Sequence, residues 1–305
     1  MHVAAVRLPL YAAGLSVIAA TVITGCQAGA GSGAAAGGPS ASGGASAPAS
    51  GAALDAVKRA TKTAAGANSF TGTMNVRITA KPGAAGTAGT PGRFGLAATF
   101  AEQLHPSLLA SVDVQSLSSS GTSLPGGLSE IITPATLYLK WSFLTQTLHI
   151  GKPWLAIPVS AIGKNSGVNL GQVFSEVTGN GPLTQSQLLA GATSVRRVGT
   201  GSIDGVPVTE YTGKLPLDRG ISFLSGSAKA QVRQAIAAAG FRTATFDVWI
   251  DGQHTVRKAV VTEAGKAVTE TTTTTITSIN QPVNITVPAA GQTASPPNSD
   301  HANLH

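Results

Sequence analysis

Cys26 is the only cysteine in the chain of 305 residues, so it carries the only thiol available for covalent chemistry. Arg7 is the only lysine or arginine before Cys26. An apolar stretch then runs from Leu8 to Thr24, directly ahead of Gly25. A short basic region, an apolar region and small residues before a cut are the parts of an export signal. The spacing therefore predicts an exported protein whose single thiol lies at the processing site.

The residues around this thiol resemble the lipobox of a bacterial lipoprotein signal. Gly25 and Cys26 match the pattern Leu-(Ala/Ser)-(Gly/Ala)-Cys, whereas Ile23 and Thr24 depart from it. The resemblance implies that residues 1–25 are a signal peptide. It also implies that Cys26 receives a diacylglyceryl group, with acyl chains such as palmitate, and becomes the new N-terminus. Such a protein is held by its lipid anchor on the extracytoplasmic face of the cell membrane.

Two other interpretations of this segment stay open. Cys26 can be an unmodified cysteine, which often behaves as a small buried hydrophobe, although the glycine-rich residues after it offer nothing to bury it. The stretch from Leu8 to Thr24 can be a retained transmembrane helix, although it is shorter than the roughly 20 residues of a spanning helix and contains Pro9. Whether Cys26 is lipidated or the apolar stretch is retained as a helix, the rest of the chain is expected to lie outside the cytoplasmic membrane.

The rest of the sequence lacks the patterns of catalytic and metal-binding residues. Neither Ser-x-x-Lys nor Gly-x-Ser-x-Gly occurs, and no His-Glu-x-x-His or Cys/His ligand spacing occurs. Asp247 and Asp251 lie four residues apart on one predicted strand, and we interpret them as a solvated position and a turn residue rather than a catalytic pair. We therefore expect no enzyme activity, no cofactor and no metal. The dispersed histidines are His2, His105, His149, His254, His301 and His305.

The composition is that of a globular protein with a low density of charge. The formal net charge is +7, yet only 11% of the residues are charged and the basic ones are scattered. Nucleic-acid-binding proteins cluster their basic residues, so we expect no nucleic acid partner and at most a mild attraction to anionic headgroups. A single cysteine allows no intrachain disulfide. The exported domain therefore depends on its hydrophobic core, for which its length is sufficient.

Composition also divides the chain into a tether, a domain and a tail. Residues 26–50 hold the lipidated cysteine and then almost only Gly, Ala, Ser and Pro. Such a segment buries too little apolar surface to offset its ordering entropy, so we expect a disordered tether. Residues 289–305 are rich in Pro, Ser and Asn, and we expect a disordered tail. One domain, residues 51–288, remains between them.

The spacing of apolar residues predicts an α+β domain. Residues 54–65 have helical spacing, and residues 70–78 begin a series of segments with a period of two. Asp204-Gly205 between two β-rich runs is a strong hairpin signal. Further strands are expected at 94–100, 108–117, 136–141, 154–157, 194–203, 206–213, 243–250, 256–262 and 268–279, and further helices at 168–177, 182–192 and 218–239. This order predicts a long antiparallel sheet covered by a few helices.

Three strand motifs carry a family resemblance. Residues 137–140 and 152–154 are similar to a Y-x-K … W strand pair, and residues 205–213 to a G-x-P-V-x-x-Y-x-G hairpin. Residues 246–251 are similar to a V-x-V-W-I-D strand, and residues 257–258 supply Arg-Lys in the strand after it. In this order behind a lipobox and a tether, the motifs resemble the LolA-like lipoproteins of actinobacteria, the group that includes LprG and LppX.

The resemblance implies a curved, unclosed antiparallel β-sheet, a half-barrel wrapped around a few helices that encloses an apolar cavity. It implies a membrane-anchored lipoprotein that binds and carries lipids or lipid-linked molecules, and it supplies no catalytic residues. A non-catalytic lipoprotein that scaffolds partners in the cell envelope is the alternative, and an enzyme with an unrecognised site is the third class. The candidate cavity residues are large apolar residues at predicted inward positions, namely Phe100, Leu109, Leu139, Trp154, Phe174, Leu188, Phe223 and Trp249.

We predict that Cys26→Ala releases the protein from the membrane fraction or leaves an unprocessed precursor, because no other thiol can accept the lipid. Membrane fractionation combined with intact-mass measurement checks this outcome. Thr21→Ala, within the apolar region, is the control and should leave both observations unchanged. Full membrane retention of Cys26→Ala at an unchanged mature mass would contradict the prediction.

Overall fold

The computed structural model describes most of the predicted domain. The described residues are 51–81, 92–123, 127–147, 149–158, 187–224, 239–295 and the single positions 229, 232, 233, 236 and 237. Cys26, the tether, Phe174 and the helix predicted at 168–177 lie outside these residues. None of the described helices has the length and apolarity needed to cross a membrane.

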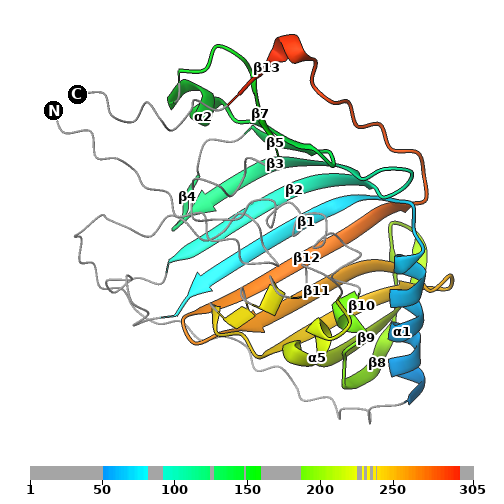
Figure 1. Ribbon diagram of the computed structural model, residues 1–305. Coiled ribbons are helices and arrows are strands. Elements are labelled where there is room, and N and C mark those ends of the chain that lie inside the picture. Colours follow the sequence, from blue (N-terminus) through cyan, green and yellow to red (C-terminus); the bar gives the residue numbers. More distant parts are fainter. Residues whose placement is uncertain are drawn as a thin grey trace.

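The described strands form a single curved sheet (Figure 1). The strand order is β13-β7-β6-β5-β3-β2-β1-β12-β11-β10-β9-β8, with β4 paired to β3. The bounds are β1 Ser69–Ala80, β2 Arg93–Gln103, β3 Leu109–Ser119, β4 Thr122–Ser123, β5 Leu128–Ile132, β6 Thr136–Lys140, β7 Trp154–Pro158, β8 Ser194–Ile203, β9 Val206–Pro216, β10 Thr243–Asp251, β11 Val256–Ala264, β12 Val268–Ile279 and β13 Thr293–Ala294.

This sheet is open and almost entirely antiparallel. Its end strands, β13 and β8, pair only with β7 and β9 among the described strands. The pairing of β13 with β7 is parallel, and the other paired strands are antiparallel. The predicted α+β half-barrel is therefore confirmed.

Within the described residues, few helices accompany the sheet. They are α1 (Gly51–Ala65), α2 (Ser142–Thr147), α5 (Leu217–Ile221) and a single 3-10 turn, η2 (Ala290–Gln292). Helix α1 confirms the predicted amphipathic helix, and Ala53, Val57 and Ala60 are buried along one side of it. These three residues join the core formed by the β8–β11 end of the sheet, beside which α1 stands in Figure 1.

One face of the sheet, which we call the inner face, carries the core. In β10 the alternate residues Ala244, Phe246, Val248 and Ile250 are buried there, in one cluster with the apolar side of α1. The inner face continues across β12 and β1 to the other half of the sheet, where strand side chains form two smaller clusters. Their buried members are Val76, Leu96, Ala98, Val114, Leu117 and Leu128 in one, and Ala67, Phe70, Phe100 and Ile276 in the other.

Several parts of the structure differ from the predicted elements, and neither α2 nor β4 was predicted. Strand β5 (Leu128–Ile132) was not predicted, because its apolar residues follow glycine and serine and do not alternate strictly. The helix expected at 218–239 is interrupted, since α5 ends at Ile221, although Gly240 does stop the later helical residues with a φ of 69°. The tail predicted as disordered from 289 onward instead contains η2 and β13, which adds an edge strand to β7.

Two glycines on the inner face lie beneath aromatic rings of the neighbouring strand. A Cβ atom placed on Gly213 in β9 would lie 2.4 Å from Cζ of Phe246 in β10 and 2.8 Å from the backbone oxygen of Ser194. A Cβ atom on Gly72 in β1 would lie 2.2 Å from the backbone oxygen of Thr275 in β12 and 2.8 Å from Cζ of Phe100 in β2. Glycine is therefore required at both positions so that the rings can lie flat against the sheet.

We predict that Gly213→Ala lowers the free energy of unfolding by about 1–3 kcal/mol, because the added methyl group overpacks the core against Phe246. Chemical denaturation monitored by circular dichroism measures the effect. Gly201→Ala in β8 is the control, since a Cβ atom there meets no other atom within 4 Å. Equal stability of the two variants would contradict this account of the β9–β10 packing.

Candidate functional site

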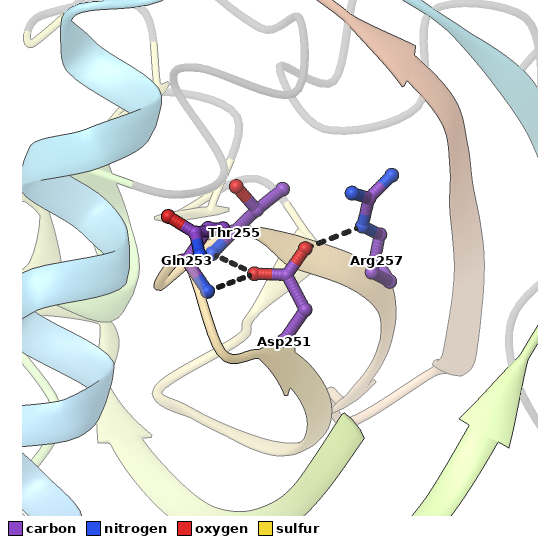
Figure 2. A network of polar contacts seen from close by, with 4 residues as sticks. All are labelled: Asp251, Gln253, Thr255 and Arg257. Atoms are coloured by element: carbon purple, nitrogen blue, oxygen red, sulfur yellow. Dashed lines mark hydrogen bonds and ion pairs between the residues drawn. The ribbon is translucent and has the colours of Figure 1, made fainter. Parts of the chain in front are cut away.

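Asp251, the last residue of the V-x-V-W-I-D motif, holds the β10–β11 turn. Oδ1 of Asp251 accepts hydrogen bonds from the backbone N–H groups of Gln253 and Thr255, both at 2.9 Å. Oδ2 accepts a hydrogen bond from Nε of Arg257 at 2.7 Å, which also forms an ion pair (Figure 2). Asp251 is 5% exposed, so these bonds compensate a buried charge. Asp251 is thus a turn residue, as the sequence predicted.

Two tryptophans of the family-like motifs take part in cation–π contacts. Nζ of Lys258 in β11 lies 4.8 Å from the ring centre of Trp249 in β10, and Nζ of Lys140 in β6 lies 5.8 Å from that of Trp154 in β7. Both tryptophans alternate with buried inner-face residues, so they lie on the outer face. The prediction that Trp154 and Trp249 point inward is therefore wrong.

Two more predicted cavity residues are not on the inner face. Leu109 pairs with Gln103 at the end of β2, whereas its neighbour Ala110 occupies the inner face, so the prediction for Leu109 misjudged the phase of the strand. Phe223 follows α5 and is 50% exposed, because the helix expected to bury it ends at Ile221. Phe174 lies outside the described residues.

The remaining three predicted residues do lie on the inner side of the sheet. Phe100 packs with Phe70 and Ile276, and Leu139 packs against the cluster around Val76 and Leu96. Leu188 is 3% exposed and belongs to the core under α1. They are distributed over all three clusters, so the structure does not gather them around one point.

A small apolar pocket lies on the inner face where α1 meets the middle of the sheet. Its volume is about 30 Å³, room for water-sized groups only. The lining comes from the end of α1, from β11, β12 and β1, and from Leu189. The lining residues are Thr63, Ala64, Phe70, Leu189, Thr255, Val256, Ala259, Val261, Thr274, Ile276 and Ile279.

A second pocket shares Leu189 and Val261 with the first and is different in chemistry. Its volume is about 20 Å³, and two glutamates line it. Glu263 of β11 and Glu270 of β12 are cross-strand partners, exposed by only 4% and 7%. Burial, together with the charge of Glu270, raises the pKa of Glu263 to about 8. Burial raises the pKa of Glu270 to about 7, against an opposing hydrogen bond from Thr272.

Two further glutamates occupy inner-face positions on the other half of the sheet. Glu102 of β2 pairs with Phe70 of β1, and Glu130 of β5 pairs with Val112 and Leu139. Both are half-buried, and burial raises the pKa of each to about 7. The sequence analysis missed all four glutamates. The sequence signal that could have identified them is a glutamate at a position where the alternation of a strand places apolar residues or threonines on the inner face.

The described part of the inner face combines apolar surface with buried carboxyl groups. Among the described residues, no group of three or more His, Cys, Asp or Glu side chains could hold a metal ion. What the inner face offers is apolar surface with a pair of carboxyl groups at its edge. Such a combination is typical of sites that recognise an amphiphilic molecule, since apolar burial gives affinity and a few polar groups fix orientation.

Among the comparisons with known proteins, only the comparison with solved structures found matches. No family model and no curated protein matches the sequence. The fold is similar to that of the lipoprotein LppX of Mycobacterium tuberculosis, with 19% identity over 77% of this chain and 98% of that one and a TM-score of 0.45. For LprF of Mycobacterium bovis the identity is 14% over 80% and 100%, with a TM-score of 0.48.

A LolA-superfamily protein of Nitrosomonas europaea is also similar, with 11% identity over 76% of this chain and 94% of that chain and a TM-score of 0.28. LppX is one of the proteins that the sequence motifs resemble. Identities this low concern the fold alone, and function has to be inferred from the residues of this chain.

We predict that the protein loses stability as the pH rises from 5 to 9. Glu263 and Glu270 have pKa values of about 8 and 7 in the folded state against 4.5 ordinarily, so the folded chain holds more protons than the unfolded chain in this window. Glu263→Gln removes a carboxylate that would be buried in its charged form at pH 9, so this variant should be more stable than the unmodified protein at pH 9 and should show a smaller loss of stability between pH 5 and 9.

Thermal unfolding at pH 5 and pH 9 measures this effect. Glu210→Gln is the matched control, because Glu210 in β9 pairs with the outer-face residue Trp249. The control should show the same pH dependence as the unmodified protein. If Glu263→Gln behaves like Glu210→Gln at both pH values, the buried pair is not the cause.

Proposed function

We propose that the protein is a membrane-anchored extracytoplasmic lipoprotein that binds and carries lipids or lipid-linked molecules on the inner face of its half-barrel. The lipid on Cys26 and the tether of residues 26–50 hold the domain at the membrane and allow it to reorient. The observation that carries the proposal is the open sheet whose inner face holds three apolar clusters and has a hollow beside α1.

Apolar burial supplies the driving force in this proposal. Each buried methylene group contributes about 0.8 kcal/mol, so affinity should rise with acyl chain length until the inner face is covered. Phe100, Leu139 and Leu188 are the proposed contact residues that remain from the sequence analysis, joined by the residues that line the pocket beside α1. No reaction is required of the polar residues.

Uptake of an acyl chain requires the inner face to open. The two pockets described above have volumes of about 30 and 20 Å³, whereas ligand pockets typically measure roughly 300–1,000 Å³. Side chains beside α1 therefore have to move aside. Helix α1 is the element proposed to move, because among the described elements its main contacts are with β8 and β11.

The small volume of these pockets favours a second candidate function, a non-catalytic scaffolding lipoprotein of the cell envelope that contacts partner proteins and carries no lipid. The two candidates differ in whether lipid accompanies the protein. Native mass spectrometry of the Cys26→Ala protein, purified without its anchor from its own cells, distinguishes them. Adduct masses of co-purified lipid support the carrier, and a bare protein mass that also fails to take up added fluorescent fatty acid supports the scaffold.

We predict that Ala259→Phe in β11 reduces uptake of a fluorescent fatty acid at least tenfold. Ala259 lines the pocket beside α1, so the larger side chain fills the space that an acyl chain would enter. Val260→Phe is the matched control, because residue 260 lies on the opposite face of the same strand. Circular dichroism establishes that both variants are folded. Equal uptake by two folded variants would contradict binding at this pocket.

A further inference from the structure

Helix α1 presents a stripe of basic side chains on the side opposite to its buried residues. Lys58, Arg59 and Lys62 are exposed, whereas most of the residues buried on this helix join the core of the β8–β11 end. With 3.6 residues per turn, the three basic residues lie within roughly 100° of one another around the helix axis. Asp55 is the only acidic residue of α1. The exposed side of the helix is therefore positively charged.

The fold itself explains only one of these three charges. Lys62 lies in the last turn of α1, where the helix dipole favours a cation. Lys58 and Arg59 lie in the middle of the helix, where the dipole gives them no such role. Among the described residues the ion pair is that of Arg257 with Asp251, so Asp55 does not neutralise the stripe. The two mid-helix charges leave room for a partner outside the domain.

Strand β8, which packs against α1, adds a further cation on the same side. Arg197 is exposed and pairs with Tyr211, which packs against the core under α1, so Arg197 lies on the side of the sheet that carries the helix. Asp204, in the β8–β9 turn, is the exposed acidic residue of this hairpin edge. We call Lys58, Arg59, Lys62 and Arg197 the basic face.

The other described elements packed in this region do not cancel the positive charge. On β11, Arg257 is paired with Asp251 and Lys258 lies over Trp249 on the outer face, while Glu263 is buried. The helical positions after α5 whose Val232 and Ile236 share the core of α1 carry the basic residues Lys229 and Arg233. The charged groups around α1 thus have a basic excess.

The position of α1 in the chain indicates what the basic face meets. The helix begins at Gly51, directly after the predicted tether of residues 26–50. A flexible chain of that length and composition has a root-mean-square span of roughly 25–30 Å. With Cys26 lipidated, α1 is therefore the described element held nearest to the bilayer, and even a weak contact with it is favoured by a high effective concentration.

We propose that the basic face docks on anionic lipid headgroups and orients the domain on the membrane, an inference that rests on the proposed membrane anchoring. A lipid chain and a basic patch are two signals that together give a stable membrane contact, whereas either one alone gives a reversible contact. Cys26→Ala should therefore still leave the membrane fraction. Docking through α1 would hold the pocket that Thr63 and Ala64 of this helix line at the membrane surface.

Vesicle co-sedimentation tests the docking on the mature chain, residues 26–305, with Cys26→Ala so that no lipid anchor masks the contact. The probes are vesicles of equimolar phosphatidylglycerol and phosphatidylcholine, and vesicles of phosphatidylcholine alone. We expect binding to the anionic vesicles to be at least tenfold tighter. This preference should disappear when salt is raised from about 0.1 M to about 1 M, because the Debye length falls from about 10 Å to about 3 Å.

Two triple variants with the same change of charge assign the contact to α1. Lys58→Gln/Arg59→Gln/Lys62→Gln should weaken binding to the anionic vesicles at least tenfold. The matched control is Arg77→Gln/Arg93→Gln/Lys214→Gln, whose three residues are exposed on the outer face of β1, β2 and β9. It should bind nearly as tightly as the unmodified chain. Circular dichroism establishes that both variants are folded.

A second measurement leaves the basic face intact. An environment-sensitive fluorophore is attached in the Cys26→Ala chain through Ala52→Cys, at an exposed position of α1, or through Thr245→Cys, at an exposed outer-face position of β10. Anionic vesicles should shift the emission of the α1 label to shorter wavelength and leave the β10 label unchanged. The reverse result would show that another surface meets the membrane and would overturn the proposal.

The outcomes separate docking from the carrier function. Equal binding to the two kinds of vesicle, binding to neither, or equal binding by the two triple variants overturns the docking. Lipid adducts found by native mass spectrometry would in that case leave the carrier function standing. Docking that follows the α1 charges without any lipid adduct supports this inference and favours the scaffolding function over the carrier.

Discussion

An open sheet has an inner face with no second sheet to cover it, and the rest of this fold depends on how that face is buried. A closed barrel fills its interior with side chains from all around. Here β13 and β8 end the described sheet without meeting, so helices and side chains must do the covering. Helix α1 and the helical turn at 187–189 cover the β8–β11 end, where the largest cluster lies. Among the described residues, the clusters of the other half consist mainly of side chains from its own strands.

Interactions on the outer face and at the turns hold the strands in place, which leaves the inner face free for other chemistry. Lys258 over Trp249 and Lys140 over Trp154 each link two neighbouring strands from outside. Asp251 closes the β10–β11 turn through its bonds to the backbone and to Arg257. The residues that carry the family resemblance are thus residues that build the half-barrel. They identify an architecture and do not identify a ligand.

Burial of apolar side chains on the inner face stabilises the fold, whereas burial of carboxyl groups there destabilises it. Four glutamates occupy inward positions, and burial raises the pKa of each. An apolar side chain at the same positions would avoid that cost. The pair on β11 and β12 adjoins the hollow beside α1, so this cost falls next to the apolar pocket.

Much of the architecture followed from the sequence because it depends on local patterns. The helical spacing at residues 54–65 produced α1, and Asp204-Gly205 produced the β8–β9 hairpin with positive φ at both residues. The strands expected around them lie within a few residues of the observed ones, since apolar residues with a period of two can be buried only in a sheet. The predicted end of the helical segment at Gly240 also holds.

Which face each strand turns inward was decided by the tertiary structure. A shift of one residue moves every side chain of a strand to the other face, and local sequence does not distinguish Trp154 from Leu155 as the inward residue. A bulge in β3 opposite Ala97 and Ala98 changes the phase again within one strand. The pairing of Glu263 with Glu270 likewise exists only once the hairpin register is set. The sequence by itself therefore determined the elements and their order, whereas the register, which depends on the whole sheet, determined the composition of the site.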